Sequence, residues 1–156
     1  MRILKIVSIV LGIQIMAIAG CGSGGGGGGG GQTAIVKLAT SGVLPGGRTI
    51  TGISTTLNYP TAKGLSISSG NVVASGVGTG SLVAPNTNNA GQVGIVLGTG
   101  TGIQTGEFVT LTFSIALGDP QVVAGDFSIA PGSTSIIDIN GAIPGITVVV
   151  QSVTIQ

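Results

Sequence analysis

Short runs in which apolar and polar residues alternate dominate the chain after its first thirty residues. The clearest run covers residues 107–117, where every second residue from Val109 to Leu117 is apolar and Thr, Ser or Ala stands between. A period of two residues is typical of a strand with one face in a core and the other near water. We therefore predict a long, half-buried β-strand over this segment.

The same pattern predicts further strands. Residues 51–59 place Ile53, Thr55, Leu57 and Tyr59 on one side. Residues 92–97 alternate in the same way, and residues 146–155 are rich in β-branched residues, as in a central strand. Weaker candidates bounded by turn residues are 34–39, 65–69, 72–75, 82–84, 127–129 and 135–139. About nine or ten short strands predict an all-β sandwich or jelly roll, because one layer could not bury so many apolar sides.

The apolar segment that opens the chain has the order of a secretory signal. Arg2 and Lys5 precede a nearly uniform apolar stretch that ends in small residues. The stretch is shorter than the ~20 residues that a membrane-spanning helix needs. We therefore predict that residues 1–20 are a cleaved signal peptide.

Ile18, Ala19, Gly20 and Cys21 end this leader. The run resembles the lipobox of bacterial lipoproteins, which usually has Leu where Ile18 stands. The resemblance implies that the signal peptidase recognises Ile18, Ala19 and Gly20, that the Cys21 Sγ carries diacylglycerol, and that the new amino group is acylated, for example with palmitate. Several acyl chains anchor a protein durably. Gly22 follows where an Asp would retain the protein, so resemblance to the Gram-negative sorting pattern implies the outer membrane, with no leaflet assigned.

An unbroken glycine run occupies residues 24–31. Glycine loses the most conformational entropy on ordering, so we expect a disordered tether. A phosphate-binding loop would need a following helix with Lys and Ser or Thr, which the sequence does not offer. The predicted organisation is a signal peptide (1–20), an acylated cysteine with a glycine-rich linker (21–32), and one β-sandwich domain (33–156).

Composition removes several classes of function. The whole chain has five Lys and Arg, four Asp and Glu, no His, and Cys21 as its one cysteine. Hydrolytic triads need a base, usually His, and a near-neutral domain lacks the electrostatic footprint of a nucleic-acid-binding protein. The sequence therefore favours a protein that is not an enzyme and uses no cofactor.

The remaining candidate groups are two lysines and four acids. A Ser–Lys pair could use a lysine as its base, and paired carboxylates could hydrolyse glycosides. We interpret the acids as turn or strand-end residues. Residues 138–141 share spacing with the start of a calcium loop but lack the closing Glu, so we predict a hydrogen-bonded turn and no metal site. The six groups are Lys37, Lys63, Glu107, Asp119, Asp126 and Asp138.

Aromatic residues are too few for a broad carbohydrate-binding platform. Tyr59 and Phe113 share the apolar sides of their strands, so we predict core positions for them and for Phe127. Phe108 lies on the other side of its strand from Phe113. We expect Phe108 to be exposed, or covered by a partner or a loop.

Several segments resemble, in order, those of the cohesin-like β-sandwich family. They are Ile50-Thr51-Gly52-Ile53, Leu57-Asn58-Tyr59-Pro60, Gly64-Leu65-Ser66, Gly102-Ile103, residues 106–113, and Asp138-Ile139-Asn140-Gly141. The resemblance covers nearly all of residues 35–155. It implies a nine-stranded jelly roll without catalytic activity, in which cellulosomal relatives use one sheet face to grip a dockerin helix pair.

The leading hypothesis is a lipid-anchored cell-envelope protein that presents a non-catalytic cohesin-like module for protein–protein binding or surface assembly. Exposed strand edges and a nearly uncharged sheet face suit such contacts. Two alternatives stay open: binding of a glycan or small ligand by loops such as residues 85–89, and a purely structural role in an envelope complex. The sequence assigns no residues to partner binding.

Overall fold

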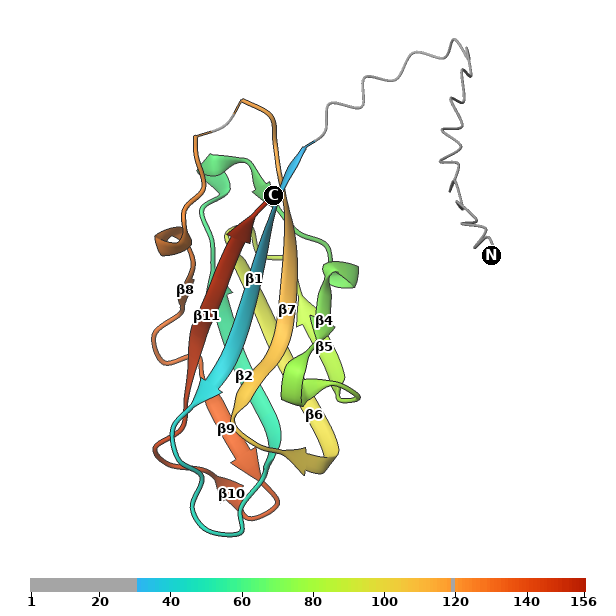
Figure 1. The fold of residues 1–156 in the computed structure, drawn as a ribbon, viewed down its shortest axis with the longest axis vertical. Helices are drawn as coiled ribbons and strands as arrows, with labels where there is room; N and C mark the ends of the chain where they lie inside the picture. The colour runs from blue at the N-terminus through green and yellow to red at the C-terminus, as the bar shows by residue number, and fades with distance from the viewer. Residues whose placement is uncertain (1–30, 119) are drawn as a thin grey trace, which may run out of the picture.

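Two antiparallel β-sheets pack face to face in the computed structural model, which describes residues 31–118 and 120–156 (Figure 1). The predicted signal peptide, Cys21, nearly all of the glycine run, and Asp119 lie outside the described residues. The strands are β1 (Gln32–Ser41), β2 (Ile50–Asn58), β3 (Leu65–Ser66), β4 (Val72–Ala74), β5 (Leu82–Asn86), β6 (Gln92–Ile103), β7 (Gly106–Ile115), β8 (Ser128–Ile129), β9 (Ser135–Asp138), β10 (Gly141–Ala142) and β11 (Thr147–Ile155). Single 3-10 turns are η1 (Thr61–Lys63), η2 (Ser69–Asn71), η3 (Gly76–Gly78) and η4 (Ala124–Asp126).

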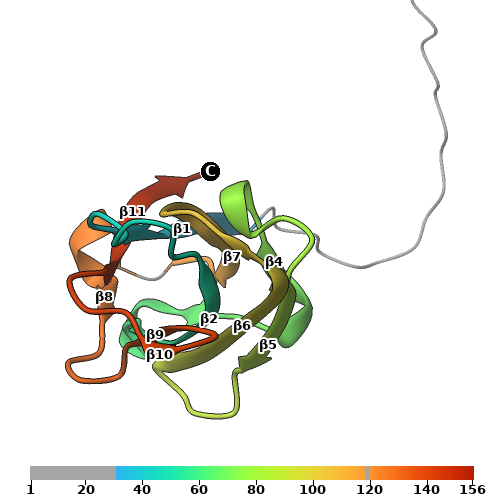
Figure 2. The same ribbon diagram turned by 90° about the horizontal axis from the view of Figure 1, so that it is seen from below.

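The sheets have interleaved topologies. Sheet A has the order β11-β1-β7-β3, with β4 also paired to β7, and sheet B has the order β10-β9-β2-β6-β5, with β8 paired to β2. Figure 2, which looks along the strands, shows β11, β1 and β7 in one layer and β9, β2 and β6 in the other. The predicted all-β sandwich is therefore confirmed.

Each predicted strand segment overlaps a strand of the structure. The sequence did not reveal β10, and β6 continues to Ile103 although we predicted its end at Leu97. Glycines at positions 98, 100 and 102 looked like turn residues. The ladder is irregular there, because Gly52 pairs with Gly98 whereas Ile50 pairs with Ile103.

The core lies between the inner faces of the two sheets. From sheet A, β7 contributes Val109, Leu111 and Phe113, and from sheet B the central strands β2 and β6 contribute a second apolar layer. All of these residues are buried, as are the second-layer residues Ile53, Leu57, Val93, Ile95 and Leu97. The two-residue period seen in the sequence thus corresponds to the inner face of each sheet.

Phe108 is fully buried, so the expectation that it lies on the outer side of its strand is wrong. The cause is a β-bulge: Leu38 pairs with Val109 and the next residue, Ala39, pairs with Glu107, which leaves Phe108 as an extra residue in β7. A bulge interrupts the alternation of side chains, so two consecutive residues can face the core. Phe108 therefore belongs to the core cluster without help from a partner.

Two other expectations about strand surroundings are also wrong. Leu117 is exposed because β7 ends at Ile115, where the pairings with both β1 and β3 also end. The last strand, β11, is not central: it pairs with β1 alone and forms an edge of sheet A. β-branched residues favour strand conformation, but they do not determine whether the strand has one neighbour or two.

An aromatic cluster joins the sheets near the start of β1. The ring centroids of Tyr59 and Phe113 lie 5.0 Å apart, and those of Phe113 and Phe127 lie 5.3 Å apart, with tilted ring planes. Such tilted pairs add to the stabilisation from buried area. The predicted core positions of Tyr59, Phe113 and Phe127 are confirmed, since Phe113 and Phe127 are buried and Tyr59 packs against the core.

Glycine at position 78 is required by the close approach of η3 to β7. A Cβ at Gly78 would lie 2.2 Å from the carbonyl oxygen of Phe108. We expect Gly78→Ala to lower the free energy of unfolding by about 1–3 kcal/mol, because the backbone of β7 must move. The matched control is Gly70→Ala in η2, where a Cβ meets nothing within 4 Å. Urea denaturation measures both, and equal stability of the two variants would contradict the packing described.

Candidate functional site

The outer face of sheet A is polar. Its rows pair Ile35 with Thr112 and Lys37 with Thr110, and serine and threonine side chains cover much of the rest. Lys37 Nζ donates a hydrogen bond to Glu107 Oε2 at 3.1 Å. Two exposed valines, Val73 and Val149, also lie on this face, where β7 and β1 separate them. The face is therefore mostly polar, with single apolar side chains of the kind that solvated surfaces ordinarily carry.

The outer face of sheet B is apolar and uncharged over its centre. Register places Ile137, Gly52, Gly98 and Leu82 in one row across β9, β2, β6 and β5, and Ser135, Ser54, Val96 and Ala84 in the next. Leu82, Val96 and Ile137 are 77%, 53% and 43% exposed. We call these eight residues the sheet B patch. An exposed apolar group of this kind, bordered by polar residues, is typical of an interaction surface.

Glycines shape the patch. A Cβ at Gly52 would lie 2.9 Å from Ile137 Cγ1, so the missing side chain allows Ile137 to lie over β2. Between Ile137 and Val96 is a shallow hollow, with Ser54 and Ser135 along it. The hollow offers apolar walls and two hydroxyl groups, which suits an apolar side chain with a polar neighbour.

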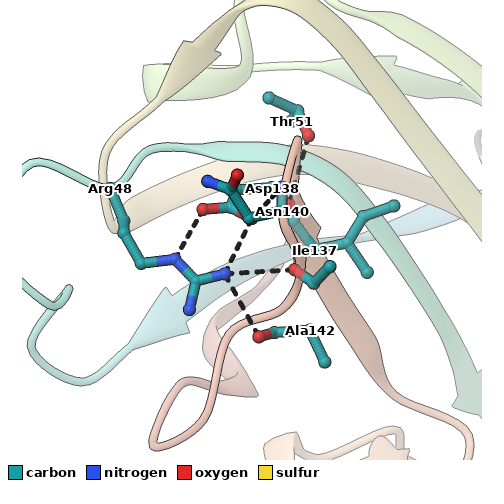
Figure 3. A network of polar contacts seen from close by, with 7 residues as sticks. Arg48, Thr51, Ile137, Asp138, Asn140 and Ala142 are labelled. Carbon is teal, nitrogen blue, oxygen red and sulfur yellow. Dashed lines mark hydrogen bonds and ion pairs between the residues drawn. The ribbon is translucent and has the colours of Figure 1, made fainter.

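A polar network holds the β9–β10 hairpin beside the patch (Figure 3). Arg48 Nη2 donates to Asp138 Oδ1 at 2.7 Å, and Arg48 Nε donates to the other carboxylate oxygen at 2.5 Å. The same Nη2 donates to the carbonyl oxygens of Gly141 and Ala142, both at 3.2 Å. The arginine thus ties the loop between β1 and β2 to the hairpin that carries Ile137.

The carboxylate of Asp138 is satisfied within the protein. Its side chain is 4% exposed, and its Oδ1 also accepts the backbone N–H of Asn140 at 2.7 Å. Hydrogen bonds from Arg48 first, and then from Asn140, hold the pKa of Asp138 well below its usual range. The prediction of a hydrogen-bonded turn at residues 138–141 is confirmed.

The other lysine is also paired. Lys63 Nζ lies 2.8 Å from both carboxylate oxygens of Asp126 and 2.9 Å from the carbonyl oxygen of Gln121. The hydrogen bonds from Lys63 and from the backbone N–H of Val123 lower the pKa of Asp126. Lys37 and Lys63 therefore donate to carboxylates and not to a serine, which leaves the Ser–Lys alternative without support.

Every charged side chain in residues 31–118 and 120–156 takes part in an ion pair. The three pairs are Lys37–Glu107, Arg48–Asp138 and Lys63–Asp126. The same residues contain no group of three or more His, Cys, Asp and Glu that could hold a metal ion. Nor do they contain a helix long and apolar enough to cross a membrane.

The predicted site residues fall in different places. Ile18, Ala19, Gly20 and Cys21 lie outside the described part of the chain, so lipidation stays a prediction. The candidate ligand loop at residues 85–89 begins in β5 and turns through a hydrogen bond from the Asn88 N–H to Asn86 Oδ1 at 3.1 Å. The sandwich is longest along its strands, and this loop lies at the end where β1 begins, far from the Arg48–Asp138 network.

Sequence reasoning missed the sheet B patch. One signal was available: Val96 stands between Ile95 and Leu97, so three consecutive apolar residues interrupt the alternation of β6. In a strand, one of the three must face outward. Leu82 and Ile137 become part of the same surface only through the register of β5 and β9, which the sequence did not show.

Comparison with known proteins bears on the fold. No family model matches the chain, and no curated protein matches it. Among solved structures, the chain is similar to a non-cellulosomal cohesin from the hyperthermophilic archaeon Archaeoglobus fulgidus, with a TM-score of 0.53, 16% sequence identity and coverage of 72% of each chain. The fold is therefore that of a cohesin-like β-sandwich.

Acid should weaken the contribution of the Arg48–Asp138 pair. A carboxyl with a lowered pKa in the folded state stabilises the protein fully above the pKa of the unfolded chain, about 4, and loses that contribution as the pH falls further. We expect Asp138→Asn to unfold more easily at neutral pH, with a difference from wild type that is constant down to about pH 4 and shrinks below it. Denaturant titrations at each pH measure this.

The control for this experiment is the same substitution in an Arg48→Gln background. Without the guanidinium, the free energies of unfolding of the proteins with and without Asp138→Asn should no longer approach each other as the pH falls below about 4. The assignment would be contradicted if the difference in the free energy of unfolding between wild type and Asp138→Asn were the same at pH 7 and pH 2. These two values lie on either side of the usual carboxyl pKa, each more than about 1.5 units from it.

Proposed function

We propose that this chain is a non-catalytic, lipid-anchored envelope protein whose sandwich binds another protein through the sheet B patch. The observation that carries the proposal is the contrast between the two outer faces. Sheet A presents hydroxyl groups, an ion pair and two valines that lie apart from each other. Sheet B presents Leu82, Val96 and Ile137 in two adjacent rows, with a hollow between Val96 and Ile137. A monomer gains nothing in stability from exposing such a face, and a partner can bury it.

The pairing of the charges within the domain determines which interactions are left for binding a partner. Because each described Lys, Arg, Asp and Glu is already paired within the molecule, none is free to steer a charged ligand. Binding would rest on apolar burial at the patch and on hydrogen bonds from Ser54 and Ser135 at its centre. Such an interface is compact, and its affinity changes little with salt.

The cohesin-like fold supports a binding role in place of catalysis. The structural neighbour is named as a non-cellulosomal cohesin, and fold similarity at this level carries over the architecture alone. Within the described residues the lysines and acids are held in ion pairs, so the groups that acid–base chemistry would need are engaged. These observations favour a scaffold that presents a surface.

The anchor is the second half of the proposal and rests on the sequence. Cys21 ends a lipobox-like run, and the glycine run separates it from β1. With lipid on Cys21, the sandwich would stand off the outer membrane by the length of the glycine linker. The end of the sandwich that carries the Arg48–Asp138 network would then point away from the membrane, because β1 runs from the linker toward that end.

A photoreactive residue placed in the patch tests the binding surface. We expect a benzoylphenylalanine at Val96 to form a covalent adduct with a partner protein when intact cells are irradiated, because Val96 is at the centre of the patch. The matched control carries the same residue at Ser114, an exposed position on the outer face of sheet A. Gel shift and mass spectrometry identify the adduct.

Two outcomes would contradict the assignment. Equal yields of adduct at Val96 and Ser114 would remove the distinction between the faces. A third variant carries the photoreactive residue at the exposed Asn88. Adducts that form from this variant alone, and with a glycan, would favour the ligand-binding loop at residues 85–89.

Mass spectrometry of the mature N-terminus tests the anchor. We expect a protein that begins at Cys21 and carries diacylglycerol on Sγ and an acyl chain on the amino group. In a Cys21→Ala variant, we expect the protein to leave the membrane fraction, because no thiol remains to be modified. A free thiol at Cys21 on a secreted or cytosolic product would refute the anchor and leave the patch untouched.

A further inference from the structure

The turn that joins β9 to β10 carries an almost fully exposed isoleucine. Ile139 is 88% exposed, although the residues that usually form tight turns are Gly, Pro, Asn, Asp and Ser. The alternation along β9 leaves Ile137 exposed and Asp138 buried, so the next residue, Ile139, continues the exposed side. Because Ile137 belongs to the sheet B patch, the apolar surface of the patch extends onto the turn.

Hydrogen bonds on both sides of β9 hold this turn in place (Figure 3). Arg48 binds the carboxylate of Asp138 before the turn and two carbonyl oxygens of β10 after it. On the other side, Thr51 Oγ1 donates to the carbonyl oxygen of Ile137 at 3.4 Å. A side chain on a fixed backbone loses less conformational freedom when it is bound, so Ile139 is preorganised for a contact.

The surroundings of Ile139 show what kind of surface could bind it. The Asp138 side chain is 4% exposed and is bound by Arg48, so the turn presents no unpaired charge. A charged group that approached this site would lose water without gaining an ion-pair partner. The chemistry that fits is an apolar recess in an uncharged protein surface.

Exposure alone does not identify a contact, because single exposed apolar residues are common on monomeric proteins. Val43, in the loop between β1 and β2, is 89% exposed at the same end of the sandwich. Ser41 and Gly42 precede it, so no exposed apolar residue leads to it from β1. Ile139 differs from Val43 because it continues the sheet B patch.

We propose that the protein that covers the sheet B patch also covers the β9–β10 hairpin and takes Ile139 into an apolar recess, with Arg48 as the residue that positions the turn. This contact rests on the binding role proposed above, and it adds the extent of the interface and the chemistry of the partner. Ile137 and Ile139 would form one continuous apolar edge, whose burial adds to that of Val96. A partner confined to the flat part of sheet B would leave Ile139 in water.

Photocrosslinking of the full chain in intact cells tests this contact. We expect benzoylphenylalanine at Ile139 to form an adduct with the same protein that is captured from Val96. The matched control carries the photoreactive residue at Val43, which is equally exposed and should give little or no adduct. Mass spectrometry identifies the protein captured from each position.

The role of Arg48 has its own test. We expect Arg48→Gln to lower the yield of adduct at Ile139 relative to the yield at Val96, because the turn loses the guanidinium that fixes it. The control Lys63→Gln breaks another ion pair, Lys63–Asp126, and should leave this ratio unchanged. The ratio compares two positions in the same background, so a general loss of stability would not mimic the result.

The outcomes separate this contact from the proposed binding role. If Val96 captures a protein and Ile139 does not, the contact at the hairpin is refuted and the sheet B patch stands. The same holds if Ile139 captures a different protein or lipid, or if Val43 gives as much adduct as Ile139. No adduct at Val96 would remove both the binding role and the contact. An unchanged ratio in Arg48→Gln would refute the positioning role of Arg48.

Discussion

The structure depends on the burial of two inner sheet faces against each other. Each strand can bury only alternate residues, so β2 and β6 on one side and β7 on the other must be opposed for either set to leave water. The bulge at Phe108 adds a large aromatic side chain to this layer, and Phe113 reaches Tyr59 and Phe127 across it. Once the inner faces are paired, the outer faces and the strand edges are the surfaces left for function.

The small number of charged residues determines the character of the outer faces. The described residues carry three basic and three acidic side chains, and each ion pair joins segments that are distant in the chain. Ion pairs used in this way order loops and hairpins, as Arg48 does for β9 and β10, and they leave the middle of sheet B uncharged.

Much of the fold could be predicted from the sequence, because alternation is a local signal. The strands at β2, β6 and β7 and the core positions of Phe113 and Phe127 follow from it directly. What failed depends on neighbours in space. The bulge that turns Phe108 inward requires knowledge of β1, and the edge position of β11 requires the order of strands in sheet A. The sheet B patch was missed for the same reason, since only register brings Leu82, Val96 and Ile137 together. The lipobox residues remain a sequence-level prediction.

The central claim is that the outer face of sheet B is covered by a partner in the cell. Because Cys21 is the one native cysteine, single substitutions Ser54→Cys and Ser114→Cys report on the two faces through their rates of thiol labelling. Both side chains are exposed in the free protein and should label at similar rates when it is purified. In intact envelopes, the account predicts slow labelling at position 54 and unchanged labelling at position 114. Equal rates at both positions in the envelope would contradict it.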